Sequence, residues 1–343
     1  MTEIKNIIFN KFGSSAKYLF QDLIDREDTI DIDVNVPNSN KIVNFIRMVH
    51  TSQTIRRVVD IPGQSLWFDM RQLDKYAKNG VNFIFVNEAL AFINMEVLNR
   101  MKKRYPASRF VLIMLDSMHA NVRNLVTGRK LIKNFNWDLV LSFDSLDCQE
   151  FRFHPLEYKY FSTPKNMPEN TKATRNLVYI GGAQPNDDRI DRLRNLHKYL
   201  QGSNISTRFV VTNMEDANDG IEYKKNSIPY DKYLEVLAQA NVILEVLKPG
   251  QYDNTARYFE AIILNKKLLT NNPHYYRLPY YDPRWIRYFS KPEDISLKWL
   301  TEEDNVDYGY DGVSFSPNGI PDLIERYIGQ SPSIQNTPIR VEV

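Results

Sequence analysis

The strongest constraint on the fold is an alternation of short apolar runs with amphipathic stretches along most of the 343 residues. In the first half, runs typical of strands alternate with segments whose apolar residues recur every three to four positions, as in helices. The expected strands are 6–9, 31–34, 81–86, 110–115 and 139–143, and the expected helices are 16–24, 40–50, 93–105 and 125–135. Strands that alternate with helices indicate βαβ units and a parallel sheet.

A second series of the same kind follows a polar, proline-rich stretch. Its expected strands are 176–180, 207–212, 242–247, 267–270 and 285–289, and its expected helices are 189–200, 230–240, 256–264 and 321–327. A chain of this length exceeds the size at which one core usually divides. We therefore predict two α/β domains, 1–155 and 175–316, joined by a linker at 156–174. The polar tail, 331–343, is expected to be poorly ordered.

The composition excludes several classes of protein. The net charge of +2 and pI of about 8.3 are too balanced to indicate nucleic-acid binding, which normally shows as a basic patch or a pI above about 9. The longest apolar runs fall short of the ~20 residues that span a bilayer, and the first residues lack the pattern of a signal peptide. A single cysteine, Cys148, excludes an intrachain disulfide framework and a cysteine-based metal cluster. A cytoplasmic location is expected.

Chemistry should be sought in the loops after the strands, because open α/β sheets bind ligands at the carboxyl ends of their strands. The first such loop, VYIGGAQPNDDR (178–189), ends a strand in Gly181 and Gly182 before a helix begins. Glycines there let backbone N–H groups approach an anion, the helix N-terminus adds a favourable dipole, and Arg189 or Arg192 could reach a diphosphate. The alternative is a tight turn with an aspartate N-cap. Neither GxGxxG nor a P-loop sequence occurs.

The second loop, PGQYDNTARYFEA (249–261), also lies between an expected strand and helix. Asn254 or Thr255 suits the N-cap, and Thr255 with the free amides of the first turn could bind a phosphate. Glu260, one turn further, could accept hydrogen bonds from a ribose diol. The alternative is a surface i, i+3 ion pair between Arg257 and Glu260. The polar residues of this region that could contact a nucleotide are Lys248, Gln251, Asn254, Thr255, Arg257 and Glu260.

The two loops occupy corresponding positions of one expected sheet, and this arrangement resembles the donor-binding domain of GT-B glycosyltransferases. Residues 138–147 look like the end of the acceptor domain in the bacterial polysaccharide and lipopolysaccharide enzymes of this fold. Residues 178–183, 244–261 and 266–272 look like their glycine turn and nucleotide-sugar segment. The resemblance implies two Rossmann-like βαβ domains in tandem facing a cleft, with a C-terminal helix at 317–330 packing back toward the first domain.

The resemblance also implies a reaction: a sugar moves from a nucleoside-diphosphate sugar to a glycan or lipid-linked acceptor, without a metal or cofactor. It places Glu260 on the nucleotide ribose and Thr255 with the helix amides on the diphosphate. Arg189, Lys248 or Arg257 would supply the counter-charge. Many retaining GT-B enzymes carry two glutamates separated by seven residues. Tyr252 stands at the first of these positions, so retention of configuration is not supported.

An inverting transferase needs a base to deprotonate the acceptor hydroxyl, and this fold normally supplies it from the N-terminal domain. The candidate bases are Asp60, Asp69, Asp116 and His119, and Trp67 could stack on an acceptor sugar. Each aspartate could equally be a cap or turn residue. The pair Asp31 and Asp33 matches a metal-binding DxD motif, but no donor loop lies nearby. We predict no catalytic metal.

Two other functions remain open. One is a non-catalytic GT-B-like subunit that binds a glycan or a partner enzyme. The other is a nucleotide-sugar epimerase or oxidoreductase, which would need GxGxxG after the first strand, where 11–16 (KFGSSA) has one glycine. The aromatic segment 274–289 could contact a sugar or a lipid headgroup, and so bring the protein to the inner face of a membrane. An aromatic loop and edge strand packed near the cleft is the favoured alternative.

Overall fold

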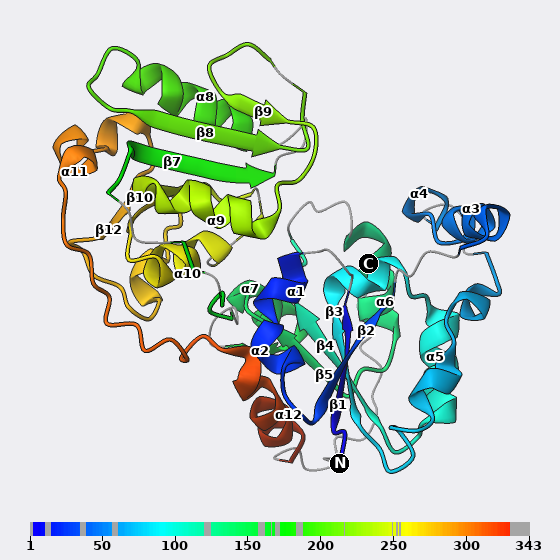
Figure 1. The fold of residues 1–343 in the computed structure, drawn as a ribbon. Coiled ribbons are helices and arrows are strands. Elements are labelled where there is room, and N and C mark those ends of the chain that lie inside the picture. Colours follow the sequence, from blue (N-terminus) through cyan, green and yellow to red (C-terminus); the bar gives the residue numbers. More distant parts are fainter. Residues whose placement is uncertain are drawn as a thin grey trace. The chain divides into compact units, whose positions relative to one another are not determined.

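The computed structural model describes residues 3–329 except 11–14, 35–38, 57–60, 120–124, 157–161, 166, 169–171, 183–187, 216, 249, 252 and 254. The chain forms two compact units (Figure 1). The first unit comprises Met1–Tyr160 together with the segment from Ser316, and the second comprises Phe161–Phe315. The predicted tail at 331–343 lies outside the described residues.

The described part of the first unit contains a six-stranded parallel sheet in the order β2-β1-β3-β4-β5-β6. Its strands are β1 Asn6–Asn10, β2 Thr29–Asp33, β3 Asn82–Val86, β4 Arg109–Met114, β5 Leu139–Ser142 and β6 His154–Pro155. Its helices are α1 Ser15–Leu19, α2 Gln21–Ile24, α3 Lys41–His50, α4 Gln53–Arg56, α5 Met95–Arg104, α6 Leu125–Asn134, α7 Ser145–Phe151 and α12 Ile320–Gly329. The strand order reverses between β1 and β3, which makes this a doubly wound sheet.

Aromatic side chains from three adjacent strands fill the core on one face of this sheet. Phe9, Phe85 and Phe110 are fully buried. The rings of Phe9 and Phe85 stack with centroids 4.5 Å apart, and those of Phe85 and Phe110 with centroids 6.1 Å apart. Met101 of α5 and Leu131 of α6 belong to the same cluster, so these two helices cover this face. Each buried aromatic side chain contributes about 1.5–3 kcal/mol, which anchors the centre of the sheet.

The last described helix, α12, belongs to the first unit although the whole second unit precedes it in the chain. Arg109, the first residue of β4, forms an ion pair with Glu325 of this helix. The hydroxyl of Tyr327 donates to the carbonyl oxygen of Pro155 at 3.1 Å. These contacts join α12 to the strands β4 and β6.

The described part of the second unit contains another six-stranded parallel sheet, in the order β12-β11-β10-β7-β8-β9. Its strands are β7 Arg175–Gly182, β8 Thr207–Thr212, β9 Glu222–Lys224, β10 Ala240–Glu245, β11 Lys267–Thr270 and β12 Ile286–Tyr288. Its helices are α8 Arg189–Leu200, α9 Tyr230–Ala238, α10 Ala256–Ile263 and α11 Leu297–Thr301. The order reverses between β7 and β10, so the carboxyl ends of these two strands form the topological switch point where such sheets bind ligands.

The predicted α/β fold with two Rossmann-like domains is confirmed. The predicted ranges 189–200, 207–212 and 267–270 coincide with α8, β8 and β11. Three differences stand out. The helix expected at 16–24 is two short helices, the strand β9 and the helix α11 were not predicted, and Asp144 caps the helix α7, which was not predicted either. Its carboxylate accepts from the amides of Leu146 and Asp147 and so caps α7.

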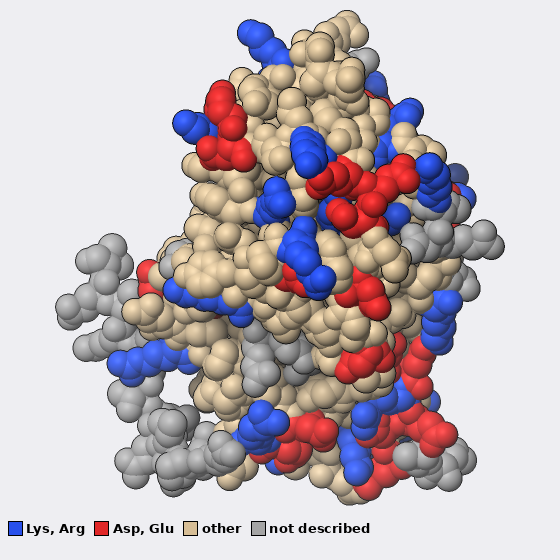
Figure 2. Space-filling model, turned by 90° about the vertical axis from the view of Figure 1, so that its left-hand side faces the viewer, with Lys and Arg blue, Asp and Glu red and all other residues tan. Residues whose placement is uncertain are grey.

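Charged side chains of both signs are mixed on the face drawn in Figure 2. Small groups of Lys and Arg lie beside small groups of Asp and Glu. This mixture matches the net charge of +2 for the whole chain. The face drawn there shows no extended basic stripe of the kind that nucleic-acid surfaces carry.

Gly80 should be the least replaceable of the first unit's glycines that the structure describes. Its φ of 88° is left-handed, and a Cβ atom there would lie 2.5 Å from the carbonyl oxygen of Ala107. Gly80→Ala should therefore lower the free energy of unfolding by about 2–4 kcal/mol in urea titrations. Gly63 has the same φ of 88° but only ordinary contacts, so Gly63→Ala should cost about 1–2 kcal/mol. Equal losses would show that the contact with Ala107 is unimportant.

Candidate active site

Two arginines from different helices converge on the end of β7. Nη2 of Arg189, the first residue of α8, donates to the carbonyl oxygen of Gly182 at 2.6 Å. Nε of Arg257, in the first turn of α10, donates to the carbonyl oxygen of Ile180 at 2.9 Å, and its Nη2 donates to the same oxygen. A Cβ atom at Gly181 would come within 3.5 Å of this guanidinium. The structure thus brings together the two loops that the sequence singled out, 77 residues apart at these contacts.

Arg257 also forms an ion pair within its own helix. Nη1 of Arg257 lies 2.7 Å from Oε2 of Glu260, and the side chains are 17% and 1% exposed. The pair is therefore buried, unlike the surface pair considered as the alternative. The hydroxyls of Tyr233 and Tyr230, on α9, donate to the same carboxylate at 2.5 and 3.3 Å. Burial and the charge of Glu260 raise the pKa of Tyr230, which keeps its hydroxyl protonated as a donor.

A second buried carboxylate, Glu245, ends β10 beside this pair. The amide and the hydroxyl of Thr255 donate to its Oε1 at 3.1 and 2.6 Å, and the hydroxyl of Thr270 donates to its Oε2 at 2.6 Å. These donors are neutral, so burial prevails and raises the pKa of Glu245. The one sequence signal for this residue is its place as a glutamate within the otherwise apolar run 242–247. It was not recognised as part of the site.

Thr255 is the N-cap of α10, one of the two residues that the sequence offered for this position. Its hydroxyl accepts from the amide of Arg257 at 3.1 Å. In the loop before it, the amide of Lys248 donates to Oε1 of Gln251 at 2.9 Å, and the Gln251 amide donates to the carbonyl oxygen of Lys248 at 3.0 Å. This closed turn precedes the helix N-terminus. Asn254 and Tyr252 lie outside the described residues.

The N-terminus of α8 does not have the ordinary aspartate cap considered as the alternative for the glycine turn. Asp188 occupies the N-cap position, but its side chain makes no capping hydrogen bond. Its carboxylate instead accepts from Nε and Nη2 of Arg192 at 3.1 and 2.9 Å. Arg192 is therefore paired within α8, whereas Arg189 turns toward the end of β7.

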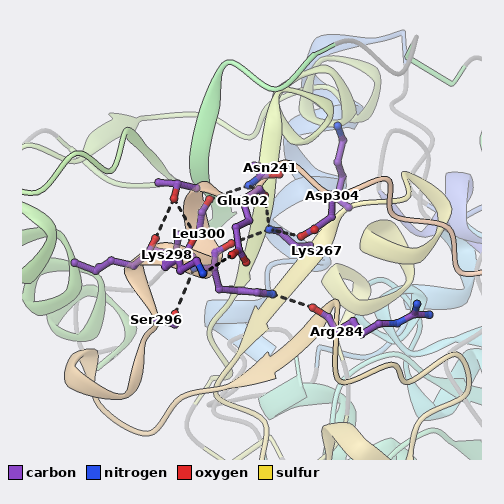
Figure 3. A network of polar contacts seen from close by, with 12 residues as sticks. Asn241, Lys267, Arg284, Ser296, Lys298, Leu300, Glu302 and Asp304 are labelled. Carbon is purple, nitrogen blue, oxygen red and sulfur yellow. Dashed lines mark hydrogen bonds and ion pairs between the residues drawn. The ribbon is translucent and has the colours of Figure 1, made fainter.

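Lys267 lies in the segment that resembles a nucleotide-sugar motif. Its contacts, however, lie at the amino ends of the strands, opposite the carboxyl ends that carry the candidate site (Figure 3). It is the first residue of β11 and is fully buried. Its Nζ donates to the carbonyl oxygens of Trp299 and Glu302 at 2.7 and 2.6 Å and to Oδ2 of Asp304 at 3.0 Å. The amide of Asn241 donates to the carbonyl oxygens of Leu300 and Glu302 nearby. This network fastens α11 and the residues after it to the amino ends of β10 and β11.

In the first unit, a histidine and two carboxylates meet at the carboxyl ends of β4 and β5. Nε2 of His119 lies 3.1 Å from Oε2 of Glu150 and 3.8 Å from Oδ1 of Asp147. Asp147 is fully buried and accepts from the amide of Met118 at 3.0 and 2.8 Å. Burial, reinforced by the charge of Asp144, raises the pKa of Asp147 to about 6 despite this hydrogen bond. The sequence had pointed to His119 but not to its two carboxylate neighbours.

The other predicted residues of the first unit differ in their surroundings. Asp116 follows β4 and is half-buried. Asp69 caps the short 3₁₀ helix η2 Met70–Leu73 and is paired with Arg71. The hydrogen bonds from Arg71 lower the pKa of Asp69, which makes this carboxylate a weaker base. Asp60 lies outside the described residues. Trp67 donates through Nε1 to Nδ1 of His50 at 2.8 Å, so this half-buried ring is already anchored in the protein.

The described residues contain no group of three or more His, Cys, Asp or Glu side chains placed to hold a metal ion. Asp31 and Asp33, which match the DxD pattern, both lie within β2 at the edge of the first sheet. Burial raises the pKa of Asp31.

Asp147 should make stability depend on pH in the acidic range. Its carboxyl has a pKa of about 6 in the folded protein, against an ordinary value of 3.8 for an aspartate. The folded state therefore binds more protons between these values, and the free energy of unfolding should fall as pH rises from about 4 to about 6. Asp147→Asn cannot ionise, so urea titrations across this range should show a smaller fall in the variant. Parallel curves for the two proteins would contradict this assignment.

Neither a scan against protein-family models nor a search of curated protein sequences gives a match. Several solved structures do match. TarM from S. aureus, as a mutant in complex with fondaparinux, α-GlcNAc-glycerol and UDP, matches with a TM-score of 0.52 and 12% identity over 76% of this chain. The match spans 58% of the length of TarM.

Two further structures match almost the whole chain. S. aureus MnaA in its structure with UDP has a TM-score of 0.51 and 10% identity, and the match covers 96% of this chain and 97% of MnaA. An α-glucosyltransferase in complex with UDP and a 13-mer DNA has a TM-score of 0.55 and 11% identity, and the match covers 96% of this chain and all of that one. At these identities the likeness shows the fold. The chain has the GT-B fold of two Rossmann-like domains.

Proposed function

We propose that this protein is a glycosyltransferase that moves a sugar from a nucleoside-diphosphate sugar to a glycan or lipid-linked acceptor. One observation carries the proposal. At the switch point of the second sheet, the Gly181–Gly182 end of β7 lies against guanidinium groups from α8 and α10, next to the N-terminus of α10. Free amides at a helix N-terminus and nearby fixed positive charge are what a diphosphate requires.

The charges of this region favour an anionic ligand. The guanidinium of Arg189 donates to the carbonyl oxygen of Gly182, and that of Arg257 donates to the carbonyl oxygen of Ile180. Neither arginine is a surface group held only by a carboxylate. Of the two buried carboxylates, Glu260 is compensated by Arg257, and Glu245 accepts hydrogen bonds from Thr255 and Thr270. Lys248 would add a third cation in the loop before α10. Positive charge fixed in advance stabilises the departing diphosphate without reorganisation.

The similar structures support a uridine nucleotide as the donor. Those of TarM, MnaA and the α-glucosyltransferase each contain UDP. TarM was also studied with glycan ligands, which supports a glycan acceptor. Synthesis of a bacterial polysaccharide or lipopolysaccharide is our proposal for the pathway class. We further propose that transfer requires no metal, so activity should persist in a chelator.

In the proposed reaction, the acceptor hydroxyl oxygen bonds to the anomeric carbon of the donor. The bond from that carbon to the β-phosphate oxygen breaks, and the nucleoside diphosphate leaves with the electron pair. We assign the acceptor proton to His119, because Glu150 and Asp147 lie 3.1 and 3.8 Å from its Nε2 and would stabilise the imidazolium. Asp116 is the alternative base, and Asp60, Asp69 and Trp67 remain predictions on the acceptor side.

The ribose contact of Glu260 also stays a prediction. In this structure its carboxylate is buried and binds Arg257, Tyr230 and Tyr233. We therefore propose an additional role for it, which is to orient the guanidinium of Arg257 toward the end of β7. Thr255, Gln251 and Asn254 complete the proposed donor-binding residues around the α10 N-terminus.

Nucleotide binding is tested by thermal shift with UDP, GDP, dTDP, CMP and NAD, and by one glycine substitution. A Cβ atom at Gly182 would lie 3.4 Å from Asn213 Nδ2 and 3.5 Å from Thr212 Oγ1, contacts the fold can accommodate. We expect a nucleoside diphosphate to raise the melting temperature of the wild-type protein. Gly182→Ala should weaken that binding about tenfold or more, because the methyl group keeps the phosphates from the backbone.

Gly128→Ala is the matched control. Gly128 lies in α6 of the first unit, where a Cβ atom would meet Leu90 at an ordinary 3.8 Å. This variant should bind nucleotides like the wild type. A shift with NAD alone, or equal affinities for the Gly182→Ala and wild-type proteins, would refute the proposed donor site.

The assignment of the base is tested separately. His119→Ala should lower kcat by about 10²–10⁴-fold, while the Kd for the donor nucleotide and the melting temperature stay near those of the wild type. Asp116→Asn serves as the comparison. If Asp116→Asn loses kcat and His119→Ala does not, Asp116 is the base. Donor binding by the wild type with no turnover on any acceptor would favour the non-catalytic subunit.

A further inference from the structure

Helix α3 carries its apolar stripe on the outside of the protein. Ile42, Phe45, Ile46 and Val49 follow helical i, i+3, i+4, i+7 spacing and are 72%, 66%, 50% and 38% exposed, and Met48 beside them is 57% exposed. Such a stripe normally faces a core. Figure 1 shows α3 and α4 at the edge of the first unit, away from its sheet. The exposed apolar side chains of α3 are called the α3 stripe below.

The inner side of the same helix is polar and fixes this orientation. Arg47 is only 8% exposed and donates through Nε and Nη2 to Oδ1 of Asn44. Nε2 of His50 lies 2.9 Å from the carbonyl oxygen of Ile61, and Nδ1 of His50 accepts a hydrogen bond from Nε1 of Trp67. The contacts of His50 join α3 to Ile61 and Trp67, so turning the stripe inward would break them. The outward stripe is therefore built into the packing of the helix.

The charge around the α3 stripe has one sign. Between residues 34 and 59 the sequence contains four Lys or Arg residues and no Asp or Glu. Lys41, at the start of α3, is exposed beside Ile42. Arg47 lies on the inner side of the helix and Arg56 donates to the carbonyl oxygens of Ala91 and Ile93, so among the described residues the exposed cation beside the stripe is Lys41. An apolar face with a cation at its end and no carboxylate on the helix matches the surface of a bilayer that contains anionic lipids, where acyl chains lie beneath negative headgroups.

We propose that α3 docks the protein on an anionic lipid bilayer, with the α3 stripe inserted among the headgroups. Helix α3 has 10 residues, about half of what is needed to span a bilayer, and no helix in the described parts of the chain is long and apolar enough to do so. The helix thus lies in the interface. This surface differs from the aromatic segment 274–289, for which the sequence had suggested lipid contact.

A second copy of the chain is the less suitable occupant. A symmetric contact brings the same patch of both copies together. Lys41 of one copy would then lie near the α3 helix of the other, which has a lysine of its own and no carboxylate to pair with it. The like charges of the two copies oppose their contact, whereas an anionic bilayer attracts the positive charge of each copy.

Sedimentation of the full chain with vesicles tests the proposal. We expect binding to vesicles of equal parts phosphatidylglycerol and phosphatidylcholine, weaker binding to phosphatidylcholine alone, and loss of binding at high salt. Phe45→Ser combined with Ile46→Ser should lower the partition coefficient about tenfold or more, because two exposed apolar side chains no longer enter the bilayer. Lys41→Glu should weaken binding to the anionic vesicles only.

Val313→Ser is the matched control, because Val313 is also 66% exposed but lies in the second unit. It should bind vesicles like the wild type, and all variants should keep the wild-type melting temperature. No binding by the wild type, or unchanged binding by the double variant, overturns the proposal. So does self-association that the double variant abolishes, which would make a second copy the occupant. None of these measurements depends on nucleotide binding, so the proposed function and this inference can fail independently.

Discussion

The guanidinium of Arg257 holds together the edge of the second unit where we propose that the donor binds. It binds the backbone of β7 and the carboxylate of Glu260 at once, across the point where the strand order reverses. Its plane also lies over the ring of Tyr233, 4.6 Å from the ring centre. Removal of the arginine would leave a buried carboxylate without its cation, a change that typically costs about 3–5 kcal/mol. Lysine offers no planar fork and could not make all of these contacts.

The polar groups around this arginine form a continuous buried network. Thr255 connects Glu245 to the first turn of α10, and Glu260 lies one turn further along the same helix. The N-terminus of α10 is thereby positioned from two sides, by β10 through Glu245 and by β7 through Arg257. A site that recognises a diphosphate needs donors fixed in this way, since a small displacement weakens every hydrogen bond to the ligand.

The sequence predicted those parts of the structure that depend on local pattern. Buried parallel strands are continuous apolar runs, so β8 and β11 could be placed to the residue, and topology then required the two loops to share an edge. The short polar strand Glu222–Lys224 has no such pattern. The partners of Glu260 could not be foreseen, because Tyr230 and Tyr233 approach it only through the packing of α9. The role of Asp147 beside His119 likewise depends on two loops meeting. In α3 the periodicity predicts the helix but not the direction of its stripe, which His50 fixes through its contacts with Ile61 and Trp67.

The first unit is discontinuous in the chain, and this affects how the protein can form during synthesis. Residues 161–315 leave the ribosome as one uninterrupted piece, whereas the first unit lacks α12 until the residues after Ser316 emerge. Domains usually fold in the order in which they are made. Here the ion pair between Arg109 and Glu325 and the contact of Tyr327 with Pro155 must wait for the second unit to be completed. The unit that begins first is thus the last to close, and until then the part of its surface that α12 covers is open to chaperones.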